Sequence, residues 1–563
     1  MINLQRCSCF NTCVLHVLMI AITGCVTGKD RPTVTIPQGS VQGTFEKSYG
    51  GRKYSAFEGI PYGKPPLGEL RFAEPEPAGK WNGILVANQL YRCLSFSPIP
   101  FMYGVKGSED CLYVNVYVPL EKIHGNENLD VIVHIHGGYF MIAAPADMSG
   151  PAYIMDKDVV FVSFNYRLAI LGFMSTEDDI VPGNNGMKDQ VLALEWVRDN
   201  IRYFGGKPDS VTIAGTSSGG SCAHLHYLSP LSKGLFHKGF SLSGTALASW
   251  SLTEYPLKKA KLVAKHLQCP TNSTTTMVDC LRKVDGKELL LAMKKLLVFI
   301  ESIPFSPFGP VIERGPEERR FLPHHPYKLL KEGKINDVPW VTSNARDEGI
   351  YPTVFFVVTK ALGELDSRWN EIMPYVLDIQ DTVKEELKLN VVTKVRKHYL
   401  GDEHISENNK YSLIWMFSDR HYYIDGEKAA RLHTNVSKSP VYYYFFSYSL
   451  QQPFFVPGFQ NGVSHCDDCK LLFKIIGTPC ILEAEDRKMM QLFTEFITSY
   501  AKTNEPSFGD FKWLPLDPSS KSLNVLRING PGHIFMNKFD RIGDNDFWNS
   551  LPIMENEKIK NFL

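Results

Sequence analysis

The segment Val211–Gly220 reads VTIAGTSSGG, in which an aliphatic, β-branched run breaks abruptly into glycine and serine. Such a run is typical of a buried parallel strand. The letters GTSSG fit the pattern G-x-S-x-G, in which a strand enters a turn so tight that the central serine is held in strained backbone geometry with its hydroxyl exposed. A turn of this kind indicates acyl transfer, normally ester or amide hydrolysis. On this segment alone, a Gly/Ser-rich loop without chemistry remains an equal alternative.

Two serines compete for the central place in this turn. Centring the pattern on Ser217 places Gly215 and Gly219 at the two positions where a Cβ would collide with the strand or the following helix. Centring it on Ser218 would place Thr216 at one of these positions. We therefore predict that Ser217 is a nucleophile and that Ser218 supplies a backbone N–H to the developing oxyanion.

A second turn follows another predicted buried strand, Val131–Ile135, and reads HGGYF over residues 136–140. In α/β-hydrolases, an HGG-type turn after such a strand presents the remaining backbone donors of the oxyanion hole. We predict that the N–H groups of Gly138 and Tyr139 are these donors. His136 has aliphatic neighbours and no acid at useful spacing, so we expect it to be a structural hydrogen-bonding residue and not a catalytic base.

Further motifs occur in the order found in one known family. Residues 57–63 read FEGIPYG, residues 65–72 read PPLGELRF, residues 108–116 read SEDCLYVNV and residues 185–190 read NGMKDQ. With these motifs, the chain resembles the type-B carboxylesterases and cholinesterases over nearly its whole length. The resemblance implies an α/β-hydrolase fold, with a large, mostly parallel central sheet, flanking helices and long loop insertions.

In this family the catalytic serine, glutamate and histidine follow one another in that order. A predicted strand leads into NARDEG at residues 344–349, which resembles the family's acid loop, and its register gives Glu348 as the acid with Asp347 as the runner-up. The later segment GVSHCDD at residues 462–468 resembles the histidine loop and gives His465 as the base. A serine hydroxyl needs an imidazole to take its proton, and the imidazole needs a carboxylate to fix its tautomer.

Length and charge bound the organisation of the chain. No Pro/Ser-rich linker or repeat divides the 563 residues, so we expect one α/β domain over residues 29–563, where length alone would suggest about three or four. The 60 Lys and Arg balance the 60 Asp and Glu, so no basic stripe argues for nucleic acid. We expect a small-molecule ester as the partner and no cofactor. The sequence leaves the oligomeric state open.

The N-terminus predicts secretion. The apolar run at residues 14–22 follows Arg6 and precedes small residues, which is typical of a secretory signal peptide and is short for a membrane span. We expect residues 1–28 to form the signal, with cleavage between about residues 24 and 29. No later stretch is apolar enough to predict a stable membrane span. In an extracellular protein, the sequons at Asn272 and Asn435 are expected to carry glycans.

Cysteine usage fits an oxidising compartment. The family resemblance implies two disulfides, Cys93–Cys111 and Cys269–Cys280. Of the other eight cysteines, we expect those at positions 7, 9, 13 and 25 to leave mostly or entirely with the signal peptide. The remaining four are expected to be buried thiols or to form one extra bridge: Cys222, Cys466, Cys469 and Cys480. No second pair of ligands is spaced to complete a tetrahedral site with the CDDC motif at residues 466–469, so we expect no metal.

Two departures from the cholinesterases indicate a neutral ester. The loop from Cys93 to Cys111 holds no tryptophan to bind a quaternary ammonium group by cation–π attraction, and Thr216 stands where cholinesterases have glutamate. Tyr139 adds bulk where the family usually has a small residue. The turn lacks the glutamine typical of juvenile hormone esterases, and an enzyme of that kind or another specialised ester hydrolase is the alternative. A non-catalytic adhesion relative is less favoured, because the chain keeps all three triad residues.

Overall fold

The structure is a computed structural model of the chain. It describes residues 31–97, 103–454, 459, 461–475, 478, 481, 483–509 and 511–556. From Pro32 onward the chain forms one compact unit. The predicted signal peptide, at residues 1–28, lies outside the described residues. Among the described residues, no helix has both the length and the apolar character that crossing a membrane requires.

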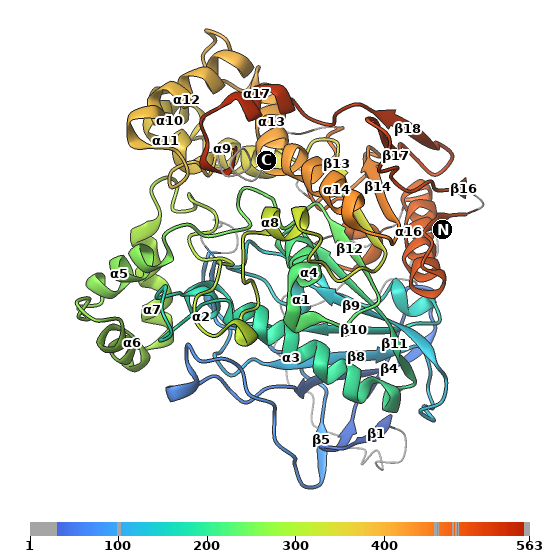
Figure 1. Cartoon of the computed structure of the whole chain (residues 1–563). Helices are drawn as coiled ribbons and strands as arrows, with labels where there is room; N and C mark the ends of the chain where they lie inside the picture. The colour runs from blue at the N-terminus through green and yellow to red at the C-terminus, as the bar shows by residue number, and fades with distance from the viewer. Residues whose placement is uncertain are drawn as a thin grey trace, which may run out of the picture. The chain divides into compact units, whose positions relative to one another are not determined.

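A large sheet runs through this unit (Figure 1). Its central pairs, from β17 to β10, are parallel, whereas β17 and β18 and the strands from β10 to β3 pair antiparallel. The strands lie in the order β18 (Ile534–Phe539), β17 (Leu523–Ile528), β14 (Val441–Phe446), β13 (Trp340–Ala345), β12 (Lys238–Leu242), β11 (Gly206–Thr216), β9 (Leu129–Ile135), β10 (Val160–Phe164), β8 (Tyr113–Val118), β4 (Lys53–Pro61) and β3 (Thr44–Lys47). The predicted α/β fold with a mostly parallel central sheet is confirmed.

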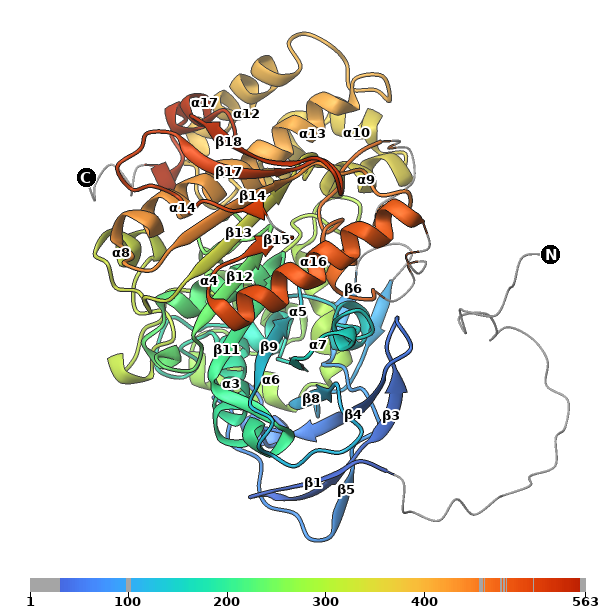
Figure 2. The same cartoon turned by 90° about the vertical axis from the view of Figure 1, so that its right-hand side faces the viewer.

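The two faces of the sheet are buried in two different cores. In β9, Val131, Val133 and Ile135 belong to the core that also holds side chains of α3 (Asn185–Asn200) and α4 (Ser218–Leu228). The residue between them, Ile132, belongs to the core formed with α16 (Ala484–Thr503). Because successive strand side chains point to opposite faces, α3 and α4 cover one face and α16 covers the other (Figures 1 and 2). A strand buried on both faces explains the continuous apolar runs in the sequence.

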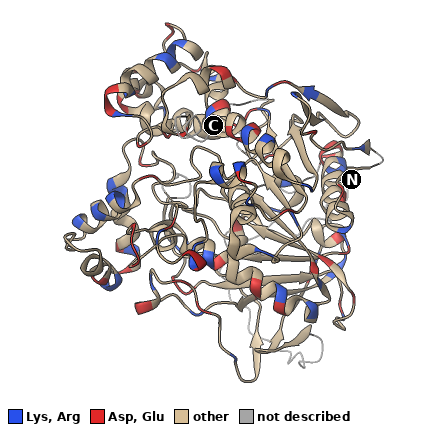
Figure 3. Ribbon diagram, viewed as in Figure 1, with Lys and Arg blue, Asp and Glu red and all other residues tan. Residues whose placement is uncertain are grey.

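The remaining elements precede, connect or follow these strands in the sequence. Small sheets are formed by β1 (Thr33–Ile36), β2 (Gly39–Gln42) and β5 (Ile84–Val86), by β6 (Ser95–Ser97) and β7 (Gly104–Lys106), and by β15 (Ser507–Phe508) and β16 (Phe511–Lys512). The other helices are α1 (Pro145–Met148), α2 (Ala169–Phe173), α5 (Pro256–His266), α6 (Thr274–Lys283), α7 (Gly286–Ala292), α8 (Pro326–Lys331), α9 (Ile350–Val358), α10 (Leu362–Ser367), α11 (Trp369–Val376), α12 (Glu385–Tyr399), α13 (Lys410–Ser418), α14 (Ile424–Val436), α15 (Cys469–Leu472) and α17 (Asn545–Ser550). Acidic and basic residues are interspersed over the ribbon (Figure 3).

The parallel strands β9, β11 and β13 end at the same edge of the sheet. Open α/β sheets place their functional groups beyond the carboxyl ends of such strands. The HGGYF turn follows β9, the serine turn follows β11 and the acid loop follows β13. The topology therefore gathers three of the predicted segments at this edge.

Candidate active site

The turn after β11 has the geometry that its glycines predict. Ser217 lies between β11 and α4 with φ 59° and ψ −123°. A Cβ on Gly215 would lie 1.9 Å from the carbonyl oxygen of Gly219, and a Cβ on Gly219 would lie 2.1 Å from that of Ile135. Since only glycine fits these two positions, the backbone adopts the register that centres the turn on Ser217.

A buried carboxylate–imidazole pair lies at the same edge of the sheet. Glu348 follows β13, and its Oε2 is 2.6 Å from Nδ1 of His465. The other oxygen, Oε1, accepts hydrogen bonds from the backbone N–H of Ala345 at 2.7 Å and from the side-chain amide of Asn344 at 3.3 Å. The side chains of Glu348 and His465 are 0% and 2% exposed. The carboxylate is thus fixed in one orientation, toward Nδ1.

Opposing effects act on the pKa of His465. Burial lowers this pKa, whereas the Cys466 sulfur and the Glu348 carboxylate raise it, and the net pKa lies well above the ordinary histidine value. The second ring nitrogen, Nε2, is buried and has no hydrogen-bond partner among the described residues. His465 is thus hydrogen-bonded to Glu348 through Nδ1 and is not hydrogen-bonded to Ser217 through Nε2.

Asp347, the runner-up for the acid, ties two loops together. Its Oδ2 accepts a hydrogen bond from the N–H of Val463 at 2.8 Å, and its own N–H donates to the carbonyl of Val463 at 2.9 Å. Arg346 Nε donates to the same carboxylate at 2.9 Å. Because these bonds join the acid loop to the histidine loop, they hold Glu348 and His465 close to each other.

The loop after β9 lies against the serine turn. A Cβ on Gly137 would lie 2.5 Å from the carbonyl oxygen of the last residue of β11. The next three residues all have positive φ, which is 113° at Gly138, 56° at Tyr139 and 60° at Phe140. The N–H of Phe140 donates to Oγ of Ser218 at 3.4 Å. The two segments that carry the predicted oxyanion donors are therefore in direct contact.

The Tyr139 side chain belongs to an aromatic cluster beside His465. Its ring stacks on Phe305 and Tyr351, with centroids 5.2 Å and 5.4 Å away, and meets Trp250 edge-on at 5.9 Å. Tyr351 in turn lies 5.5 Å from the imidazole of His465. The bulk that the sequence places beside the oxyanion loop is thus packed next to the predicted base.

Sequence reasoning missed two side chains that fix the oxyanion loop. The Tyr166 hydroxyl donates to the carbonyl of His136 at 2.9 Å, and the two rings stack at 4.6 Å. The Ser306 hydroxyl donates to the carbonyl of Tyr139 at 2.9 Å. Ser306 is 167 residues from Tyr139, so no local pattern could have found this contact.

Two buried histidines near the serine turn are neutral. Burial lowers the pKa of His134 to about 3 and that of His136 to about 4. His134 Nε2 lies 3.2 Å from Oγ1 of Thr216, and His136 Nδ1 lies 2.8 Å from the carbonyl oxygen of Gly137. His136 thus makes the structural hydrogen bond that its sequence context predicts, and Thr216 is paired with His134.

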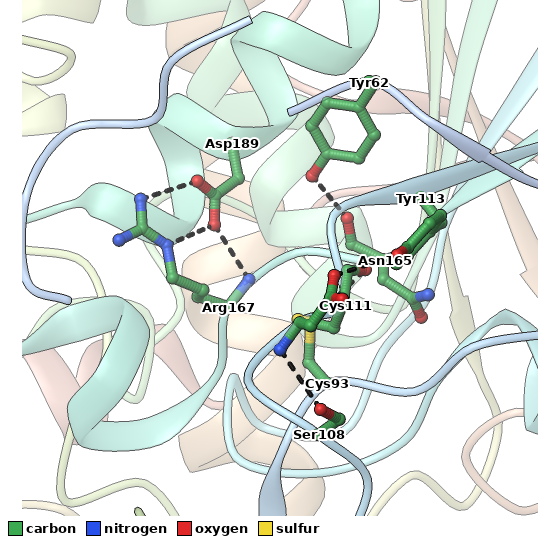
Figure 4. Close-up of a disulfide and its surroundings, with 9 residues drawn as sticks. Tyr62, Cys93, Ser108, Cys111, Tyr113, Asn165, Arg167 and Asp189 are labelled. Carbon is green, nitrogen blue, oxygen red and sulfur yellow. Dashed lines mark hydrogen bonds and ion pairs between the residues drawn. A yellow bond between two sulfur atoms is a disulfide. The ribbon is translucent and has the colours of Figure 1, made fainter. Parts of the chain in front are cut away.

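A buried ion pair supports the segment that the oxyanion loop contacts (Figure 4). Arg167 donates to the Asp189 carboxylate from Nε at 2.8 Å, from Nη2 at 2.7 Å and from its backbone N–H at 2.9 Å. The two side chains are 4% and 0% exposed. Two residues later, the N–H of Ala169 donates to the carbonyl of Phe140 at 2.7 Å. The ion pair therefore helps to position the oxyanion loop.

The cysteines divide into bridged and free residues. Among the residues that the structure describes, two disulfides form, Cys93–Cys111 (Figure 4) and Cys269–Cys280. The free and buried thiols are Cys222, Cys466 and Cys469. Cys480 lies outside the described residues. No group of three or more His, Cys, Asp or Glu side chains in the described part of the chain is arranged to hold a metal ion. Both predicted glycosylation sites, Asn272 and Asn435, are exposed.

Comparisons with known proteins bear on this site. The carboxylesterase family matches residues 30–548. The chain is 38% identical to a carboxylic ester hydrolase of Bombus ignitus, over 96% of this chain and 99% of that protein. It is 37% identical to venom carboxylesterase-6 of Apis mellifera, over 94% and 96%, and 34% identical to a juvenile hormone esterase of Tribolium castaneum, over 94% and 96%.

A solved structure shares the fold. The crystal structure of juvenile hormone esterase from Manduca sexta, with OTFP covalently attached, matches with a TM-score of 0.82 and 24% identity. The match covers 92% of this chain and 99% of that one. At this identity the likeness establishes the fold and leaves the choice of ester open.

Proposed function

Because the chain belongs to the carboxylesterase family, we propose that it is a secreted enzyme that hydrolyses neutral carboxylic esters through Ser217, His465 and Glu348. The observation that carries the proposal is the buried 2.6 Å bond between His465 and Glu348. This pair lies at the sheet edge where Ser217 leaves β11 in strained geometry. The three residues supply the nucleophile, the base and the group that orients the base.

The proposed reaction proceeds through an acyl-enzyme. His465 Nε2 takes the proton of Ser217 as its hydroxyl attacks the ester carbonyl, and Glu348 keeps the ring proton on Nδ1. The backbone N–H groups of Gly138, Tyr139 and Ser218 donate to the oxyanion. One donor of this kind is worth about 10²–10³ in kcat. The alcohol leaves with the proton, and water then hydrolyses the acyl-enzyme by the same steps.

The neutral-ester preference rests on what faces the nucleophile. The side chain before Ser217 is Thr216, whose hydroxyl is paired with His134 and carries no charge. Cation–π binding of a desolvated ammonium group is worth about 2 kcal/mol, and the loop from Cys93 to Cys111 has no tryptophan to provide it. We expect kcat/KM for naphthyl acetate to exceed that for acetylthiocholine at equal pH and salt. A tenfold preference for the thiocholine ester would contradict this.

Secretion is proposed from independent features of the chain. Two disulfides are typical of an oxidising compartment. Both sequon asparagines, Asn272 and Asn435, are exposed and therefore accessible to glycosylation. We expect the protein in the medium of expressing eukaryotic cells, with its N-terminus between about residues 25 and 30 and with a mass that falls on glycosidase treatment. Retention in the cells with an intact N-terminus would contradict the proposal.

The nucleophile is tested by a fluorophosphonate probe followed by peptide mapping. The label is expected on Ser217 and absent from Ser217→Ala, which folds as the parent does. Ser218→Ala is the matched control, because its oxyanion donor is the backbone and its Oγ only accepts the 3.4 Å bond from Phe140. It should keep activity within about tenfold of the parent. Labelling that persists in Ser217→Ala and disappears in Ser218→Ala would show that the register is wrong.

A further inference from the structure

Two free thiols lie between the predicted base and the serine turn. Cys466 directly follows His465, and Cys469 opens helix α15. The Cys466 side chain interacts with both the His465 and the Cys469 side chains. Cys469 also contacts Thr216, and its Sγ lies 3.5 Å from Oδ1 of Asp468. The pair therefore connects the histidine loop with the residue before Ser217.

The backbone at Cys466 is strained. Its φ is 69°, in the left-handed region that favours glycine. A non-glycine residue in such a conformation is destabilising, and strained residues of this kind cluster at functional sites. The chain nevertheless places a cysteine here, three residues before a second cysteine. Residues three apart within a turn bring their Cα atoms within about 7 Å of each other, which overlaps the range that a disulfide spans.

The three free thiols of the described chain differ in their surroundings. The hydrogen bond from Cys469, against the effect of burial and with help from His465, lowers the pKa of Cys466 to about 7. Burial raises the pKa of Cys222 to about 12, and its sulfur accepts a hydrogen bond from Gln190 at 3.3 Å. Because the thiolate is the reactive form, this difference in pKa favours Cys466 over Cys222 as the thiol that oxidises at neutral pH.

We propose that Cys466 and Cys469 form a redox-sensitive dithiol, which hydroperoxides oxidise to a disulfide beside His465. The Cys466 thiolate attacks one oxygen of the peroxide, so that an S–O bond forms, the O–O bond breaks and an alcohol or water leaves with the thiol proton. The Cys469 thiol then attacks the sulfenic sulfur, the S–S bond forms and the oxygen leaves as water. The two sulfurs lose two electrons in total, and the peroxide is reduced.

Oxidation is expected to inhibit hydrolysis, and this consequence rests on the proposed role of His465. The new bond draws the Cys466 sulfur away from the imidazole and toward Cys469, in a loop where the ring is already held on its other side by Glu348. A displacement of about 1 Å in a catalytic group costs up to about 10²-fold in rate. We therefore expect kcat/KM to fall by about tenfold or more and to recover when the disulfide is reduced.

The test uses the purified mature protein, treated with glutathione and then with hydrogen peroxide. Free thiols are alkylated after denaturation, and the peptides are mapped by mass spectrometry. We expect Cys466 and Cys469 to lose alkylation together and to appear in one internally bridged peptide, while Cys222 remains alkylated. Structural disulfides resist glutathione, so Cys93–Cys111 serves as the internal control. Esterase activity and fluorophosphonate labelling are measured on the same samples.

Two variants separate the oxidation of the thiols from its effect on ester hydrolysis. Cys469→Ser, whose hydroxyl can still donate to Cys466, should keep the activity of the untreated parent and stop the reaction at a sulfenic acid on Cys466, which dimedone traps. Cys466→Gly suits the left-handed backbone and should make hydrolysis insensitive to peroxide. The dithiol is overturned if Cys466 and Cys469 stay alkylated, if Cys222 oxidises equally fast, or if the bridge joins either thiol to Cys480. Equal inactivation of Cys466→Gly and the parent would overturn the effect on hydrolysis. The peptide map decides the thiol chemistry even if the protein hydrolyses no ester, so the two failures are distinguishable.

Discussion

Replacing the Glu348 carboxylate by an amide, in Glu348→Gln, isolates what this carboxylate does for His465. Oε1 accepts hydrogen bonds from the Ala345 N–H and the Asn344 side chain, so the amide oxygen of the variant has to take that place. The NH₂ group then faces His465 Nδ1, which must accept a hydrogen bond and cannot donate one. The ring proton moves to Nε2, the nitrogen that should receive the serine proton, and the base is lost.

The size of the loss follows from the geometry. The His465–Glu348 contact is 2.6 Å long and fully buried. With the two charges about 4 Å apart and an effective dielectric constant of about 20, the carboxylate stabilises an imidazolium by about 4 kcal/mol, which is about a thousandfold in rate. The wrong tautomer adds to this, and in serine proteases the corresponding substitution costs about 10⁴ in kcat. We expect kcat for naphthyl acetate to fall by about 10³–10⁴.

Asp347→Asn is the matched control, since Asp347 is adjacent and bonds to the Val463 backbone and not to His465. It should retain activity within about tenfold, because the second loop-tethering bond, from the Asp347 N–H, remains. Steady-state hydrolysis of naphthyl acetate, with urea unfolding to verify the fold, measures both variants. The assignment is refuted if Glu348→Gln keeps more than a tenth of the parent kcat, or if Asp347→Asn loses as much.

Three further outcomes are expected. The acid limb of kcat/KM should have its midpoint above the ordinary histidine pKa of about 6.5, because the Cys466 and Glu348 side chains raise the pKa of His465 against the effect of burial. Activity is then lost as the pH falls through that raised pKa. A midpoint below about 6 in stopped-flow or steady-state pH profiles would argue against this role of His465. Asp189→Asn should lower the free energy of unfolding, measured by urea titration, by about 3–5 kcal/mol, because it leaves the buried Arg167 guanidinium without its carboxylate. The exposed ion pair Arg198–Asp199 supplies the control, and Asp199→Asn should change the free energy of unfolding by about 1 kcal/mol at most. Tyr139→Gly should raise the ratio of kcat/KM for naphthyl butyrate to that for naphthyl acetate by about tenfold, because burying the two additional methylenes in the freed space stabilises the bound butyrate by about 0.8 kcal/mol each. An unchanged ratio would show that the Tyr139 ring does not limit the size of the acyl group.

The resemblance to the family predicts the fold, the acid loop and the histidine loop, and local patterns predict the serine turn and the oxyanion loop. Gly215 and Gly219 are required because a Cβ at either position would make a contact of 1.9 Å or 2.1 Å. Both glycines lie within two residues of Ser217, so the requirement appears as a local pattern in the sequence. The β-branched runs of β9 and β11 likewise predict buried strands, because both faces of each strand are buried. The roles of Ser217, Glu348 and His465 remain predictions that the proposed variants test.

Side-chain contacts between distant segments could not be predicted in the same way. Tyr166 and Ser306 brace the oxyanion loop from 30 and 167 residues away. Asp347 looked like a second choice for the acid, whereas its carboxylate and N–H both bond to Val463. These partners depend on how loops meet after folding. Neither composition nor local spacing indicates contacts between distant loops, so these hydrogen-bond partners cannot be predicted from the sequence.

Three carboxylates lie near the His465 imidazole, Asp467 and Asp468 from the histidine loop and Glu348 from the acid loop, and Glu348 is the one that bonds to it. Asp467 accepts the backbone N–H groups of Ser464 at 2.7 Å and Phe454 at 2.6 Å, and burial raises its pKa to about 7. Asp468 accepts the Tyr444 hydroxyl at 2.6 Å, and burial raises its pKa to about 6. Both acids are therefore committed to holding the loop, and neither is free to replace the carboxylate of Glu348. The large loss expected for Glu348→Gln depends on this division, because a neighbouring carboxylate that could turn toward Nδ1 would rescue the variant.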